Sequence, residues 1–101
     1  MTIGLVMKFA GLDTEKYDDI VQTLDLRLHD DDNPNWPDGI ISHAAGATPT
    51  GWCVVDVWES QAAFDKFFAD RLKPAMYQVG MTAPPEITPV EIYNTYRHGR
   101  S

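Results

Sequence analysis

The chain has a single cysteine, no apolar run long enough to cross a bilayer, and few basic residues. Cys53 is alone among 101 residues, which excludes a disulfide framework and fits a reducing compartment. No segment approaches the roughly 18 consecutive apolar residues of a membrane-spanning helix. The start, Met1 to Gly4, lacks the basic region of a secretory signal. We therefore expect a soluble, cytoplasmic protein.

Positive charge is also scarce. Eight Lys and Arg stand against fifteen Asp and Glu, which gives a net charge of −7. Such a surface repels phosphate backbones and anionic lipid headgroups, so we expect neither a nucleic-acid partner nor a membrane partner. The main consequence of this charge is solubility.

Sequence motifs for metal binding, phosphate binding and a serine nucleophile are missing as well. No Cys and His spacing typical of zinc occurs, and neither a phosphate-binding glycine loop nor a Gly-x-Ser-x-Gly elbow is present. The acidic run His29-Asp30-Asp31-Asp32 lacks the glycine and the downstream glutamate of a calcium loop. We expect no metal site.

What the chain does have is enough apolar residues, 44%, for one core, so residues 1–101 are predicted to form a single domain. Alternating and helical spacing predict six elements in the order β-α-β-β-α-β. The second helix is expected to end or kink near Lys73, because Pro74 follows. Pro89 restricts the last strand to an edge or a bulge. The predicted strands are Ile3–Phe9, Ile40–Ala47, Trp52–Trp58 and Glu86–Tyr96, and the helices begin after Asp13 and Ser60.

This order predicts the fold class: α+β, ferredoxin-like, with a four-stranded antiparallel sheet and both helices on one face. The other face is left uncovered. We expect a second copy of the chain to cover it, so that two such sheets pair face to face in a dimer.

The two central strands form the most informative part of the sequence. The turn residues 48–51, Thr-Pro-Thr-Gly, make the strands antiparallel neighbours, with His43 opposite Asp56, Ile41 opposite Trp58 and Ala45 opposite Val54. An aspartate that accepts the proton of one imidazole nitrogen leaves the other nitrogen as a base. The alternative interpretation is that His43 and Asp56 only hydrogen-bond to each other as a structural cross-strand pair.

The faces of this hairpin are assigned by composition. Cys53, Val55 and Val57 are uniformly apolar and are predicted to pack against the helices. The face that carries His43 and Asp56 is then the uncovered one, and we expect it to enclose a cavity between two protomers.

Several motifs resemble the dimeric α+β barrel superfamily, with the antibiotic biosynthesis monooxygenase-like proteins as the nearest branch. They are Met7–Leu12, Tyr17 in the first helix, and Val55-Asp56-Val57-Trp58-Glu59-Ser60 followed by Ala63-Phe64 and Phe67-Phe68. The resemblance implies a homodimer and a small-molecule pocket into which Trp58 projects. The superfamily contains cofactor-independent monooxygenases, haem-degrading enzymes, isomerases and polyketide cyclases.

Two departures narrow what the resemblance implies. The haem-degrading branch supplies a histidine from its second helix, and residues 60–80 contain none, so no haem is expected. The expected function is cofactor-free, so we expect no other cofactor. The monooxygenase branch usually has an asparagine four residues before the tryptophan, where this chain has Val54. His43 and Asp56 are what this sequence offers instead.

The sequence thus favours a cofactor-independent monooxygenase that acts on a small hydrophobic, aromatic or polyketide-like molecule by His- and Asp-assisted proton abstraction. A polyketide cyclase or isomerase that uses the same pocket is an alternative. A non-catalytic ligand-binding or dimerisation module is another, because one fold supports many functions. The predicted catalytic residues are His43 and Asp56, and the predicted substrate-binding residues are Trp58, Ile41, Val54, Asn94 on the last strand and Trp36 in the loop 29–38.

Overall fold

The N-terminal part folds as the sequence predicts. The computed structural model describes residues 2–26 and 34–95. Strand β1 (Ile3–Ala10) leads to helix α1 (Thr14–Thr23). The side chain of Asp13 caps this helix by accepting a hydrogen bond of 2.9 Å from the backbone N–H of Lys16. Ile20 and Val21 of α1 are buried, so an apolar stripe of this helix faces the interior.

The central hairpin consists of β2 (Ile40–Thr48) and β3 (Gly51–Trp58). His43 pairs with Asp56 and Ala45 pairs with Val54, as predicted. The register shifts between Ile40 and Ser42, and Ile40 lies opposite Trp58. The predicted pairing of Ile41 with Trp58 is wrong, because a β-bulge inserts one extra residue and changes the alternation beyond it.

The second helical region is continuous through three segments: α2 (Gln61–Phe67), the π-helical turn η1 (Phe68–Leu72) and α3 (Lys73–Gln78). Ser60 caps it as predicted, accepting a bond of 3.1 Å from the N–H of Ala63. The helix neither ends nor breaks at Lys73. Instead the N–H of Lys73 bonds to the carbonyl of Phe68, five residues back. This wider turn accommodates Pro74, whose ring would clash with a carbonyl in a regular α-helix.

All four strands form one antiparallel sheet in the order β2-β3-β1-β4. Strand β4 (Glu86–Glu91) is an edge strand that contains Pro89, as predicted. It is shorter than the predicted Glu86–Tyr96. Pairing with β1 ends at Glu91, and Tyr96 lies outside the described residues.

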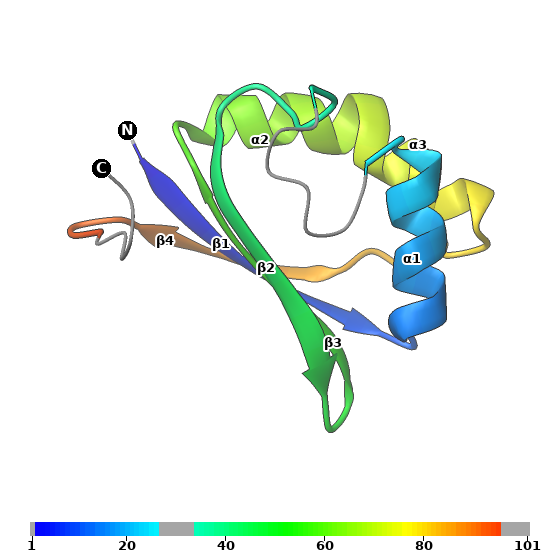
Figure 1. Cartoon of the computed structure of the whole chain (residues 1–101). Helices are drawn as coiled ribbons and strands as arrows, with labels where there is room; N and C mark the ends of the chain where they lie inside the picture. Colours follow the sequence, from blue (N-terminus) through cyan, green and yellow to red (C-terminus); the bar gives the residue numbers. More distant parts are fainter. Residues whose placement is uncertain (1, 27–33, 96–101) are drawn as a thin grey trace.

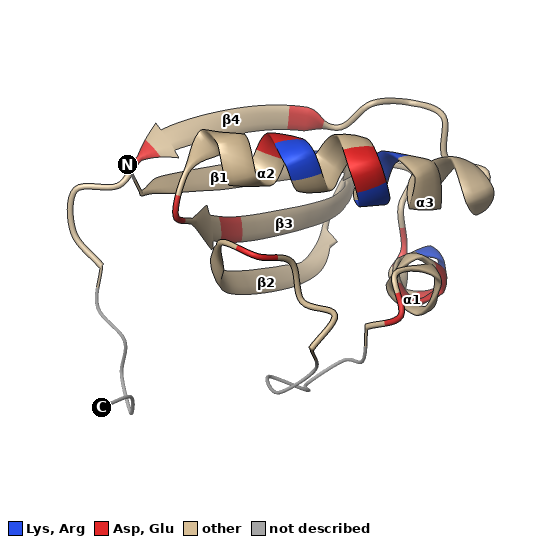
Figure 2. Ribbon diagram, turned by 90° about the horizontal axis from the view of Figure 1, so that it is seen from above, with Lys and Arg blue, Asp and Glu red and all other residues tan. Residues whose placement is uncertain are grey.

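Both helical regions lie on the same face of the sheet (Figure 1). Seen from above, α2 and α3 extend along the sheet, while α1 is viewed end-on beside them (Figure 2). The predicted class, an α+β ferredoxin-like domain with a four-stranded antiparallel sheet, is confirmed. Within residues 2–26 and 34–95, no helix is both long and apolar enough to cross a membrane.

The assignment of the two sheet faces is reversed relative to the prediction. Trp58 is fully buried, Val54 is 5% exposed and Asp56 is 4% exposed, and the two apolar residues belong to the core beneath the helices. Val55, by contrast, is 48% exposed. The uncovered face therefore carries Val55 and its alternate neighbours, and the histidine and aspartate point toward the helices.

Candidate active site

A cavity of about 400 Å³ lies between the covered face of the sheet and the helices. Its position within one protomer corrects the prediction of a cavity between two sheets. Each layer contributes apolar side chains, among them Met7, Ile20, Leu24, Trp36, Val54 and Leu72. A volume of this size is within the usual range of small-molecule sites.

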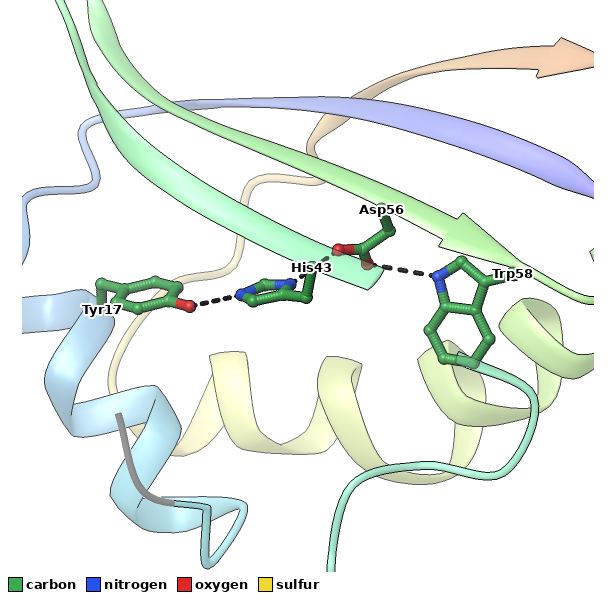
Figure 3. A network of polar contacts seen from close by, with 4 residues as sticks. All are labelled: Tyr17, His43, Asp56 and Trp58. Carbon is green, nitrogen blue, oxygen red and sulfur yellow. Dashed lines mark hydrogen bonds and ion pairs between the residues drawn. The ribbon is translucent and has the colours of Figure 1, made fainter. Parts of the chain in front are cut away.

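Polar side chains in and beside this cavity form one connected network (Figure 3). The ring of His43, from β2, lies between two partners. Its Nδ1 is 2.6 Å from Oδ1 of Asp56 on β3, and its Nε2 is 2.7 Å from the hydroxyl of Tyr17 on α1. Trp58 Nε1 donates to the second oxygen of Asp56 at 3.2 Å. The first helix and the two strands of the hairpin thus meet at one imidazole.

The donors in this network follow from the chemistry of each group. An indole N–H can only donate, and an ionised carboxylate can only accept. Asp56 therefore accepts from Trp58 and from Nδ1–H of His43. The Nε2 atom of the neutral ring is then an acceptor, and the hydroxyl of Tyr17 donates to it.

Burial makes this arrangement energetically significant. The carboxylate of Asp56 is nearly inaccessible to water, and each of its oxygens has a donor. A buried charge without such partners is strongly destabilising, so the two hydrogen bonds explain how an aspartate is tolerated here. The His43 side chain keeps 23% of its surface exposed and lines the cavity.

Tyr17 is held in its protonated form. Burial, followed by the negative charges of Asp56 and Asp18, raises the pKa of the Tyr17 hydroxyl to about 12. Its ring packs against Trp52, with centroids 5.0 Å apart. The phenol is therefore a hydrogen-bond donor throughout the physiological pH range.

The structure places the residues predicted from the sequence in three groups. His43, Asp56, Val54 and Trp36 all line the cavity, and the rings of Trp36 and His43 are 5.6 Å apart. Trp58 lies behind Asp56 and packs on Phe64, outside the cavity lining. Two predicted binding residues do not reach it. The bulge puts Ile40 there in place of Ile41, and Asn94 is exposed beyond the end of β4.

Tyr17 is the site residue that sequence reasoning missed. In the sequence it stands out only as a first-helix residue of the resemblance, and in the structure its ring packs against the core. The available signal was that its hydroxyl is the one polar group in a stripe otherwise made of Ile20, Val21 and Leu24. A buried tyrosine hydroxyl usually has a hydrogen-bond partner. Only the folded chain reveals that the partner is His43.

The prediction about metal concerns clusters of ligating side chains. Among residues 2–26 and 34–95, no group of three or more His, Cys, Asp or Glu side chains is arranged to hold an ion. The acidic run that begins at His29 lies outside the described residues.

Fold and site together define a ferredoxin-like domain with an apolar cavity and a buried Tyr-His-Asp network. No protein-family model and no curated protein sequence matches the chain. Solved structures do. The protein is similar to Rv0793 from Mycobacterium tuberculosis, at 17% identity and a TM-score of 0.61, over 96% of this chain and 100% of that one.

Two other similar structures are oxygenases of Streptomyces. One is a mutant of SnoaB, a cofactor-independent oxygenase from Streptomyces nogalater, at 14% identity and a TM-score of 0.58, with 93% of each chain covered. The other is the monooxygenase ActVA-Orf6 of Streptomyces coelicolor in complex with nanaomycin D, at 19% identity and a TM-score of 0.53, over 95% of this chain and 90% of that one. The chain therefore has the fold of the antibiotic biosynthesis monooxygenase-like proteins.

Proposed function

We propose that this protein is a cofactor-independent monooxygenase that acts on a small aromatic or polyketide-like molecule. The observation that carries the proposal is the His43–Asp56 pair, which is largely shielded from water and faces an apolar cavity of about 400 Å³. The shared fold with SnoaB and ActVA-Orf6 supports the same reaction class.

The first step is removal of a proton from the substrate. His43 is the base, since its Nε2 carries no proton in the neutral network, and Asp56 stabilises the imidazolium that forms. Because the cavity is apolar and Asp56 is buried, water screens the attraction between imidazolium and carboxylate only weakly. General-base catalysis of this kind contributes about 10²–10⁴-fold to a rate.

The second step uses dioxygen as the oxidant. A phenol or its keto tautomer, once deprotonated, is electron-rich and transfers an electron to O₂. The two radicals combine through a new C–O bond to give a peroxide anion, which takes the proton back from the His43 imidazolium and becomes a hydroperoxide. At an activated CH₂ group, loss of water then leaves a carbonyl. One CH₂ and one O₂ become one C=O and one H₂O, so the reaction needs no external reductant.

Oxygen uptake with anthrone as the probe tests the proposal. The purified protein, without added flavin, nicotinamide or metal, is expected to consume one O₂ per anthrone and to release anthraquinone. His43→Ala and Asp56→Asn are each expected to slow uptake by about 10²–10⁴-fold, while the exposed control Asp70→Asn keeps the wild-type rate.

Three results would overturn the proposal: no uptake above buffer, wild-type rates in both variants, or product formation without oxygen consumption. The last result would indicate a cyclase or isomerase that uses the same base.

We also propose that two copies pair through the uncovered face of the sheet. Val55 and Val90 are 48% and 44% exposed there, and Ile92 packs beside Gly4 on the same face. Apolar side chains grouped on one sheet face favour association with a second copy. Because each cavity lies beneath the helices of its own protomer, pairing leaves both cavities intact.

A further inference from the structure

We propose that Tyr17 is a catalytic residue: the hydroxyl of a neutral phenolic substrate donates to the Tyr17 oxygen, and its proton reaches His43 only through Tyr17. This inference rests on the proposed function and specifies which atom of the site meets the substrate.

The hydrogen-bonding capacity of each polar atom leads to Tyr17. Nδ1 of His43 is used by Asp56 at 2.6 Å, and Nε2 is used by Tyr17 at 2.7 Å. Both oxygens of Asp56 have donors, and this residue is 4% exposed. The Tyr17 oxygen donates its one proton but retains acceptor lone pairs. Tyr17 is also one of the residues that line the cavity, so we assign its oxygen as the acceptor for an incoming hydroxyl.

Proton transfer then balances through the chain of bonds. The substrate O–H bond breaks as its proton moves to the Tyr17 oxygen. At the same time the original Tyr17 proton moves to Nε2 of His43, which becomes an imidazolium paired with Asp56. Tyr17 ends as it began, a neutral phenol. A pKa of about 12 disfavours a free Tyr17 phenolate, which is why the two transfers occur together.

A competing arrangement has the opposite consequences. If the substrate displaces the Tyr17 hydroxyl and bonds to His43 directly, Tyr17 competes with the substrate for Nε2. Removing the hydroxyl would then strengthen binding of a phenol and leave turnover unchanged or faster.

Binding of two matched probes distinguishes the arrangements without turnover. The probes are 2-naphthol, which donates a hydrogen bond, and 2-methoxynaphthalene, which cannot. In Tyr17→Phe we expect the affinity for 2-naphthol to fall about tenfold and that for 2-methoxynaphthalene to stay unchanged, as loss of one hydrogen bond requires. Tyr77→Phe, on the exposed side of α3, is the matched control and keeps both affinities.

The inference is overturned if Tyr17→Phe binds 2-naphthol as tightly as the wild type or more tightly, or if 2-naphthol does not bind the wild type. Proton NMR of the wild-type protein gives a second test that needs no variant. The Tyr17–His43 hydrogen-bond proton persists when 2-naphthol binds in a relay, and it disappears if the probe displaces Tyr17.

Anthrone oxidation separates this inference from the proposed function. We expect kcat of Tyr17→Phe to fall at least 10²-fold, a larger loss than the tenfold change in affinity. If the wild type oxidises anthrone and Tyr17→Phe does so equally well, the relay is wrong and the oxygenase remains. If the wild type is inactive but the probe pattern holds, the oxygenase is wrong and the Tyr17 contact remains.

Discussion

The carboxylate of Asp56 depends on two donors, His43 and the indole of Trp58, because it is almost wholly removed from water. Those donors depend on it in turn, since Trp58 is fully buried. The polar network is thus a structural element as well as a candidate site. Loss of this network is expected to lower both the stability of the fold and the rate of the reaction, and different variants measure the two effects.

Truncation of Asp56 is expected to destabilise the fold. Asp56→Ala leaves the buried indole N–H of Trp58 without its acceptor, at a cost of about 1–3 kcal/mol in the free energy of unfolding. Asp70→Ala removes a carboxylate that is 59% exposed and is expected to change stability by less than about 0.5 kcal/mol. Urea unfolding measures both. Equal stabilities of the two variants would show that the network contributes nothing to the fold.

The stability of the fold is expected to fall at alkaline pH because of Tyr17. Folding raises the pKa of this hydroxyl from 10.0 to about 12, so the unfolded chain loses the proton first as pH rises. The contribution of protonated Tyr17 to the free energy of unfolding is complete below pH 10 and is lost between pH 10 and about 12. Across that window the wild type is expected to lose more stability than Tyr17→Phe, as measured by urea unfolding. Parallel losses would contradict the assignment.

At the scale of elements, local sequence determines most of what is observed. Turn residues between β2 and β3 give the pairing of His43 with Asp56, because a short connection permits few registers. The bulge near Ile41 was not predictable, since it depends on how the start of β2 meets the end of β3. Likewise the π turn before Pro74 reflects packing that keeps the helix continuous where a proline alone would end it.

The junction at Gly39 fixes the start of β2 against the second helix. Its carbonyl accepts from the N–H of Glu59 at 2.8 Å, its φ is +91°, and a Cβ there would lie 2.7 Å from that of Ala63. Gly39→Ala is therefore expected to cost about 1–3 kcal/mol more than Gly80→Ala, whose φ is +88° with open space around it. Thermal unfolding compares the two. Equal costs would mean that helix contact at Gly39 is unimportant.

At the scale of the whole molecule, the fold and the order of the elements were predictable from the sequence. The prediction of which sheet face the helices cover was wrong. Alternation along β3 defines two faces and does not say which one the helices cover, since both are apolar apart from Asp56. The useful signal was side-chain size. Trp52 and Trp58 bury far more area than Val55 and Val57, and the large aromatic rings lie in the core. The contact between Tyr17 and His43 joins residues 26 positions apart, so only the tertiary fold brings it about.

Pairing of two copies is expected to be sensitive to charge on the uncovered face. Val55→Lys places two like charges near each other in a dimer and removes an apolar contact, so we expect sedimentation to show monomers. Tyr77→Lys changes a comparably exposed apolar residue on the helical layer and is expected to leave the dimer intact. A dimer that persists in Val55→Lys would place the interface elsewhere.

The direction of the hydrogen bonds around His43 is the basis of the proposed oxygenase and of the Tyr17 relay, and ¹⁵N NMR of the imidazole measures it without any substrate. At neutral pH we predict a proton on Nδ1, directed at Asp56, and a bare Nε2 that accepts from Tyr17. A neutral ring with its proton on Nε2 would contradict the account, because the nitrogen that faces Tyr17 could then not accept a proton.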